Sequence, residues 1–266
     1  MSAIVIDGGL VHYESMGRGK PLLFLHGWLG SWRYWMSTMQ VMADQYRTYA
    51  LDFWGFGDSD KTKARYSVPD YVDLIDNFVS ALGIERLSLV GHSLGATVML
   101  EYALHRPERI DKLMAISLPM SMACVNRKLL NFSDNSMMAK LLWWRQQAIH
   151  EEVLAETQKT DQQAITTSLQ SMGQMNINNH LKRIDRLAGP LMLAVYGEKD
   201  DVIDPGPMRQ MNGHWPHIRP MGLAQSKHFP MLDEASRFHR LLKDFLELDQ
   251  DLAALELKEE WRRRTR

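Results

Sequence analysis

Short apolar runs alternate with amphipathic stretches along most of the chain. Residues Ala3 to Ser15 alternate around Asp7-Gly8-Gly9, which predicts a β-hairpin. Pro21 to Leu25 is a short apolar run that ends at His26-Gly27, a pattern typical of a strand buried on both faces. The opening of the chain is therefore predicted to form strands.

Helix-like and strand-like segments then take turns up to residue 118. The predicted strands are 48–51, 87–90 and 112–118, and the predicted helices are 31–43, 68–82 and 94–105. Strands separated by helices need crossover connections, which build a mostly parallel sheet with helices on both faces. The predicted fold class is therefore α/β.

The rhythm breaks over residues 119–187, where strand-like runs give way to helical segments. Ser133-Asp134 and Thr160-Asp161 are capping pairs for helices that extend to residues 156 and 171. Several methionines and the pair Trp143-Trp144 make this segment apolar as well as helical. We interpret it as a helical cap inserted into the α/β core.

The sheet pattern resumes after Gly189-Pro190. Strands are predicted at 191–196 and 217–223, and a helix at 231–248 closes the core. The remaining residues form a charged stretch that is a candidate amphipathic helix. We therefore divide the chain into a core of residues 1–118 and 188–248, a cap of residues 119–187 and a tail of residues 249–266.

Composition and charge are those of an ordinary globular protein. Hydrophobic residues make up 45% of the chain and charged residues 24%, a balance too apolar for intrinsic disorder. The formal net charge is -1, so no broad field attracts nucleic acid or an anionic membrane. A small neutral substrate is the expected partner, and we interpret the terminal arginine run 262–266 as a solvated helix end.

Cysteine use and the first residues bear on the compartment. The single cysteine, Cys124, excludes an internal disulfide and fits a reducing environment. Residues 1–9 have neither a basic nor an apolar signal-peptide region, and the longest uncharged stretches are too short to span a bilayer. We expect a cytoplasmic protein, and the sequence leaves open whether it is a monomer or a homodimer.

The chemistry is carried first by the pentapeptide Gly91-His92-Ser93-Leu94-Gly95. This G-x-S-x-G pattern lies between a predicted strand and a predicted helix, which is the context that a nucleophile elbow requires. The tight turn forces the serine into a strained conformation and places it at a helix N-terminus, which favours developing negative charge. Ser93 is therefore the candidate nucleophile.

A second predicted strand end supplies donors for an oxyanion. An oxyanion hole needs two N–H groups aimed at the same oxygen, and we assign them to the main chain of Trp28 and Leu94. His26 precedes this turn, and we expect it to brace the loop by hydrogen bonds rather than to take part in chemistry.

These motifs together resemble the α/β-hydrolase superfamily over about residues 4–248. The landmarks, in the family's order, are His26-Gly27-Trp28, the turn from Asp52 to Ser59, Gly91 to Gly95, Gly197-Glu198-Lys199-Asp200 and His228-Phe229-Pro230. The resemblance implies an eight-stranded, mostly parallel sheet, a helical cap and a triad in the order serine, acid, histidine. It also implies a scaffold role for Asp52 and its turn.

The acid and the base follow later strands. Asp200 takes the acid position of the family-like Gly-x-x-Asp pattern, and we prefer it to its neighbour Asp201. Asp204 precedes Pro205, a pairing that suits a helix start. His228 lies after the last predicted strand and is the best general base among the ten histidines.

The expected reaction is acyl transfer to water. Serine at position 93 argues against the chemistry of similar dehalogenases and epoxide hydrolases, which place an aspartate there. We expect cleavage of a carboxylic ester or lactone through an acyl-enzyme. C–C bond hydrolysis, cofactor-free perhydrolysis, aminopeptidase activity, acyl transfer to an acceptor other than water and a slow-turnover ligand receptor stay open.

The substrate pocket is predicted from neighbours of the proposed triad and from the cap. Its candidate residues are Trp28, Met120, Trp143, Val202 and Phe229. No H-E-x-x-H, cysteine-rich or G-x-x-x-x-G-K-[ST] pattern is present, so we expect no metal, nucleotide or other cofactor.

Overall fold

The computed structural model describes residues 2–62, 64–127, 150–187, 190–211, 215–249 and 251–257. One eight-stranded sheet crosses the molecule in the order β1-β2-β4-β3-β5-β6-β7-β8. Its strands are β1 (Ser2–Ile6), β2 (Gly9–Met16), β3 (Lys20–Leu25), β4 (Tyr46–Leu51), β5 (Leu87–His92), β6 (Ile110–Ile116), β7 (Leu191–Gly197) and β8 (Ile218–Leu223). β2 pairs antiparallel with β1 and β4, and every other neighbouring pair is parallel. The predicted α/β fold class is confirmed.

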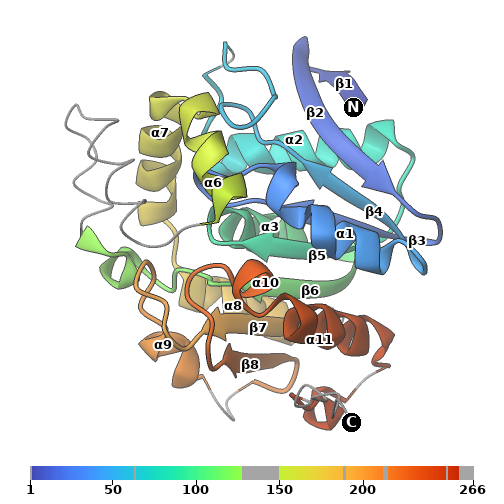
Figure 1. Cartoon of the computed structure of the whole chain (residues 1–266), viewed down its shortest axis with the longest axis vertical. Coiled ribbons are helices and arrows are strands. Elements are labelled where there is room, and N and C mark those ends of the chain that lie inside the picture. The colour runs from blue at the N-terminus through green and yellow to red at the C-terminus, as the bar shows by residue number, and fades with distance from the viewer. Residues whose placement is uncertain are drawn as a thin grey trace, which may run out of the picture.

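Helices cover both faces of this sheet (Figure 1). They are α1 (Met36–Met42), α2 (Val68–Ala81), α3 (Leu94–His105), α6 (Glu151–Glu156), α7 (Gln162–Gly173), α8 (Ile177–Arg186), α9 (Gly206–Arg209), α10 (Pro230–Asp233) and α11 (Ala235–Glu247). α1 contacts α11 on one face, while α3 contacts both α2 and α8 on the other. All residues of β5 and β7 are buried, as expected for strands covered on both sides.

Most predicted elements of the core appear with small shifts at their ends. The predicted helix 94–105 matches α3, whereas β6 begins at residue 110 instead of 112. The predicted helix 231–248 is divided into α10 and α11, because Glu234 has the non-helical angles φ −128° and ψ 52°. In the predicted tail helix, residues 252–254 form a 3-10 turn, and residues 258–266 lie outside the described residues.

The predicted cap is described only in part. The capping pair Ser133-Asp134 lies outside the described residues, while α6 covers the end of the helix predicted to reach residue 156. Asp161 caps α7 as predicted, since its side chain accepts the N–H of Gln163. None of the described helices is both long and apolar enough to cross a bilayer.

Hydrogen bonds fasten α7 to the core at several points. The N–H of Asp161 donates to Gly55 O at 2.7 Å, and Tyr66 donates its hydroxyl proton to the Asp161 carboxylate at 2.8 Å. Further along α7, the indole N–H of Trp28 donates to Ser168 Oγ at 2.8 Å. The loop that carries Trp28 is therefore tied to a helix distant in sequence.

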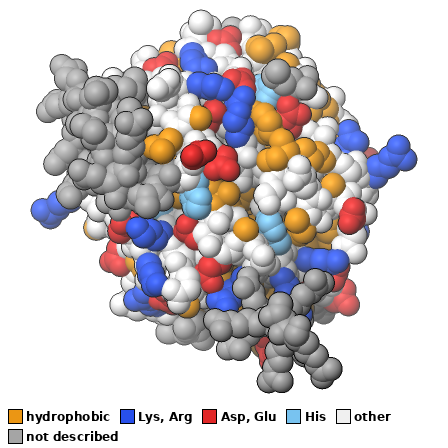
Figure 2. Space-filling model, in the orientation of Figure 1, with side chains coloured by type: hydrophobic (Ala, Val, Ile, Leu, Met, Phe, Trp, Pro, Cys, Tyr) orange, Lys and Arg blue, Asp and Glu red, His pale blue; other side chains and the backbone are white. Residues whose placement is uncertain are grey.

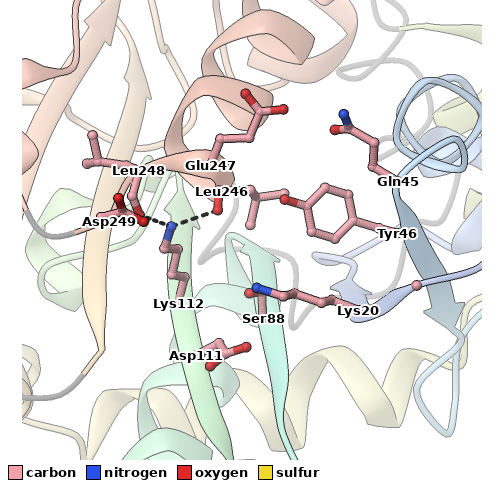
Figure 3. A pocket seen from close by; sticks show the side chains of 11 residues that line it. Lys20, Gln45, Tyr46, Ser88, Asp111, Lys112, Leu246, Glu247, Leu248 and Asp249 are labelled. Atoms are coloured by element: carbon pink, nitrogen blue, oxygen red, sulfur yellow. Dashed lines mark hydrogen bonds between the residues drawn. The ribbon is translucent and has the colours of Figure 1, made fainter.

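A polar cavity of about 610 Å³ lies at the amino ends of β3, β5 and β6 (Figure 3). Within it, Lys112 Nζ donates to the main-chain oxygens of Phe245, Leu246 and Leu248 at the end of α11. Cations stabilise helix C-termini because the last carbonyls carry partial negative charge. Since Ser93 follows the carboxyl end of β5, this cavity lies at the other end of the sheet from Ser93.

The surface matches the near-neutral composition. Figure 2 shows acidic and basic side chains intermixed over the described part of the visible face, in agreement with a formal net charge of -1.

Candidate active site

The turn between β5 and α3 holds Ser93 in a strained conformation. Its backbone angles are φ 53° and ψ −113°, a region that residues other than glycine rarely adopt, and the residue is 3% exposed. The Ser93 N–H donates to Ile116 O at 2.9 Å, which fixes the turn against β6. Gly95 is required because a Cβ there would lie 2.5 Å from the carbonyl oxygen of Leu25. The sequence therefore makes the tight elbow that the G-x-S-x-G pattern predicts.

Asp200 follows β7 and is held by the main chain beyond it. Its Oδ1 accepts the N–H groups of Val202 and Ile203 at 2.8 and 2.9 Å, and its side chain is 1% exposed. These two bonds fix the orientation of the carboxylate and leave Oδ2 for another partner. The neighbouring Asp201 is exposed. Asp204 accepts the N–H of Gly206 at the start of α9, the structural role predicted for it.

That other partner is His228, in the loop between β8 and α10. Nδ1 of His228 lies 2.9 Å from Asp200 Oδ2, so the predicted acid and base are in contact. Both are buried, which strengthens their electrostatic interaction. An imidazole oriented in this way carries its Nδ1 proton toward the carboxylate and leaves Nε2 able to accept one.

The elbow and the His228 loop meet through the residue before the serine. Nε2 of His92 lies 2.8 Å from the main-chain oxygen of His228, and the two imidazole rings have centroids 4.7 Å apart. The structure records no hydrogen bond between Ser93 Oγ and the His228 ring. Catalytic hydrogen bonds of this kind are often long in free enzymes and tighten in the reacting complex.

The loop after β3 lies against the same elbow. A Cβ on Gly27 would lie 3.0 Å from Ser93 Cβ and 2.9 Å from His92 Nδ1, so only glycine allows this approach. Trp28 is next in the chain, and Leu94 is the first residue of α3. Their N–H groups are therefore carried by two segments that meet at Ser93, while the Trp28 side chain points to Ser168.

His26 has the bracing role that the sequence predicts. Its Nε2 accepts the N–H of Phe53 at 2.9 Å, and its Nδ1 lies 2.8 Å from Gly27 O. Burial lowers the pKa of His26, which keeps the ring neutral. His26 therefore joins the turns after β3 and β4.

The predicted pocket residues differ in how far they are buried, and one of them lies outside the described residues. Met120, Val202 and Phe229 are buried, Trp28 is partly buried, and Trp143 lies outside the described residues. The Phe229 ring packs on the rings of His92 and His228, with centroids 4.9 and 5.2 Å apart. Val202 contributes its N–H to the Asp200 carboxylate, a role that the sequence analysis did not give it.

One cluster among the described residues has the composition of a metal site. His12, Asp52 and Asp58 offer ligand atoms within 4.8 Å of one another. Asp58, however, is paired with Arg33 at 2.8 Å and with Lys159 at 2.9 Å. Burial opposes ionisation of Asp58, but hydrogen bonds from these two cations outweigh it and lower its pKa to about 2. We therefore assign this cluster to the scaffold and not to metal binding.

Three buried polar side chains beside His228 were missed at the sequence level. Ser117 donates its hydroxyl proton to the His228 carbonyl at 3.1 Å, and Tyr34 Oη lies 3.1 Å from His92 Nδ1. No motif marks Tyr34 or Ser117, and His92 stands at the variable position of the elbow. Only the fold brings them to the His228 loop.

A family model described as alpha/beta hydrolase fold matches residues 20–153, just over half of the chain. The chain belongs to the α/β-hydrolase family. It is 30% identical over 114 residues to a soluble epoxide hydrolase of Corynebacterium sp. strain C12, a match covering 43% of this chain and 40% of that protein. The curated relatives it matches are covered over 28% to 40% of their own length.

Solved structures resemble this chain over nearly its whole length. The enol-lactonase of Burkholderia xenovorans LB400 superposes with a TM-score of 0.79 at 15% identity, covering 92% of this chain and 99% of that one. A thermophilic esterase of Thermogutta terrifontis gives a TM-score of 0.78 at 17% identity, with 92% and 97% covered. At such identities the likeness shows the fold alone.

Proposed function

We propose that this α/β hydrolase cleaves a carboxylic ester or lactone of a small, largely apolar substrate through an acyl-enzyme on Ser93. The proposal rests above all on the buried hydrogen bond between His228 and Asp200, 2.9 Å long, beside the strained Ser93 elbow. An acid fixed by main-chain N–H groups, an imidazole fixed by that acid and a serine at a helix start are the parts of a serine nucleophile site.

In the proposed reaction, His228 Nε2 takes the Ser93 hydroxyl proton as Oγ attacks the carbonyl carbon. Asp200 stabilises the imidazolium that forms, and the N–H groups of Trp28 and Leu94 hold the oxyanion. The imidazolium then protonates the alkoxide, which departs as the alcohol of an ester or, in a lactone, stays attached to the acyl group as a free hydroxyl. Water, activated by the same imidazole, attacks the acyl-enzyme, releases the acid and restores Ser93.

Serine at position 93 separates this proposal from epoxide opening. Similar epoxide hydrolases place an aspartate at this position, and an ester-forming carboxylate is then the attacking group. The identity to a named epoxide hydrolase therefore supports the family, while the Ser93 hydroxyl supports acyl chemistry. C–C bond hydrolysis and perhydrolysis use the same triad and are distinguished by products.

The test is a substrate screen with paired variants. p-Nitrophenyl esters of different chain length, lactones, epoxides and ring-fission diketones are assayed with the wild type, Ser93→Ala and Ser88→Ala. Ser88 is a buried serine near the start of β5, the strand that leads to Ser93, so it is a matched control. We expect Ser93→Ala to lose turnover by at least about a thousandfold and Ser88→Ala to keep it.

Three results would contradict the proposal. Ester turnover that survives in Ser93→Ala would remove the nucleophile from the scheme. Epoxide hydrolysis faster than ester and lactone hydrolysis would change the reaction class. Stoichiometric labelling of Ser93 by a fluorophosphonate, combined with a single slow turnover of every substrate, would indicate a ligand receptor.

A further inference from the structure

We propose that Tyr34 and His92 are positioning residues that join the main chain of His228 to the loop after β3, which carries Gly27 and Trp28 and is called the oxyanion loop below. This inference rests on the proposed function, since it concerns the same site. A chain of hydrogen bonds carries it, running from the Gly27 N–H through the Tyr34 hydroxyl and the His92 ring to the His228 carbonyl.

The direction of each bond follows from the His228 end. The main-chain oxygen of His228 only accepts, so His92 Nε2, 2.8 Å away, carries the proton of that ring. A neutral imidazole then has a lone pair on Nδ1. The Tyr34 hydroxyl lies 3.1 Å from Nδ1 and is its donor. The network thus assigns the tautomer of His92.

The other end of the chain reaches the oxyanion loop. Having donated its proton to His92, the Tyr34 oxygen accepts the Gly27 N–H at 2.6 Å. Gly27 precedes Trp28, whose N–H is a proposed oxyanion donor. Both ends of this series of hydrogen bonds are therefore next to groups that react in the proposed mechanism, although neither Tyr34 nor His92 acts on the substrate.

Burial favours the neutral forms of Tyr34 and His92. Tyr34 and His92 are 2% and 1% exposed. Burial and the nearby charge of His228 hold the pKa of His92 well below its ordinary value, and burial raises the pKa of Tyr34 well above its own. His92 therefore stays neutral when His228 takes up a proton.

A third contact closes the arrangement around His228. Ser117, the residue after β6, has a positive φ of 47° and donates to the same carbonyl oxygen at 3.1 Å. The ring of His228 is held by Asp200, and its main chain is held by His92 and Ser117. A shift of the His228 loop would break several buried hydrogen bonds at once, and leaving buried polar groups unpaired is unfavourable.

The decisive variants change single atoms. Tyr34→Phe keeps the ring and removes the hydroxyl, leaving His92 Nδ1 and the Gly27 N–H without partners. His92→Leu removes both ring nitrogens, whereas His92→Gln keeps an amide donor and an amide acceptor. Tyr71→Phe is the matched control, because Tyr71 is also buried. Its hydroxyl donates a hydrogen bond to the main-chain oxygen of Trp54, which is not part of the series from Gly27 to His228.

We expect losses in kcat with little change in KM. Displacing a catalytic group by part of an ångström costs roughly 10- to 100-fold, so Tyr34→Phe should lose about tenfold and His92→Leu about a hundredfold. His92→Gln should recover most of the loss of His92→Leu. Rates are normalised to the sites titrated by a fluorophosphonate, so that misfolded protein does not count. If His92→Leu does not fold, Tyr34→Phe and His92→Gln carry the test.

The inference is overturned if Tyr34→Phe has the kcat of Tyr71→Phe per titrated site, or if His92→Gln is as impaired as His92→Leu. It is also overturned if Tyr34→Phe lowers the melting temperature alone, since that is the behaviour of a packing residue. Failure of the proposed function looks different: the wild type would not be labelled, or Ser93→Ala would be as active as the wild type.

Discussion

Replacement of Asp200 by asparagine would change one acceptor of this side chain into a donor without changing its shape. Oδ1 accepts two N–H groups at 2.8 and 2.9 Å, and Oδ2 lies 2.9 Å from His228 Nδ1. An asparagine keeps both main-chain bonds only when its carbonyl oxygen takes the Oδ1 position. That orientation places its NH2 group against His228 Nδ1.

The opposite amide orientation is much less favourable. It points the NH2 group at two N–H donors and forfeits two hydrogen bonds worth about 1 kcal/mol each. The asparagine therefore forces a lone pair onto His228 Nδ1 and moves the ring proton to Nε2. A histidine in that tautomer cannot accept the Ser93 proton, and the loss in kcat is about 10⁴-fold, or about 5.4 kcal/mol of transition-state stabilisation.

The assay is kcat for the best p-nitrophenyl ester at pH 7.5, per mole of protein, with circular dichroism to check the fold. Asp201→Asn is the control, because Asp201 is the adjacent exposed acid, and it should keep the wild-type rate. A folded Asp200→Asn variant that loses less than about tenfold would refute the tautomer argument. A large loss in Asp201→Asn instead would identify the other aspartate as the acid.

Three further changes test the scaffold around the site. Trp28→Phe removes the hydrogen bond from the indole N–H to Ser168 but keeps the main-chain N–H of residue 28. KM should therefore rise about threefold while kcat stays within about twofold of the wild-type value, and a fall in kcat of about 100-fold would contradict this. Gly95→Ala places a Cβ 2.5 Å from a carbonyl oxygen and should lower the free energy of unfolding, measured by urea denaturation, by at least about 2 kcal/mol. The control is Gly173→Ala, whose added methyl meets no atom closer than 3.6 Å and which should be neutral. Asp58→Asn should cost about 1 kcal/mol at pH 7. Because the folded pKa of about 2 lies below the unfolded value, the difference from the wild type should shrink as pH falls below about 4 and be lost only below about pH 2; a difference that does not shrink between about pH 5 and about pH 2 would exclude the ion pairs as its cause.

Local signals predicted the parts of the fold that depend on neighbours in sequence. The elbow residues predicted a strand, a turn and a helix, and α3 begins and ends where its apolar pattern and the following Pro107 indicate. The hairpin around Asp7-Gly8 was predicted for the same reason, since positive φ angles occur at both positions.

Tertiary contacts decided the rest. Tyr34 and His92 are 58 positions apart, and His92 and His228 are 136 apart, so no local pattern shows that they meet. The break at Glu234 has a similar origin. Its carboxylate accepts the N–H of Gln225 and the hydroxyl of Ser226, and thereby holds the loop before His228 instead of extending a helix.

The strained conformation of Ser93 places the serine hydroxyl at the elbow but lowers the stability of the fold. Its backbone angles of φ 53° and ψ −113° suit glycine and cost an L-residue about 1–3 kcal/mol. A glycine at this position would relieve that cost and abolish the hydroxyl in the same step. Selection of a variant library for heat resistance alone would therefore enrich chains that have lost the proposed nucleophile, so a thermostable version has to be selected for turnover and melting temperature together.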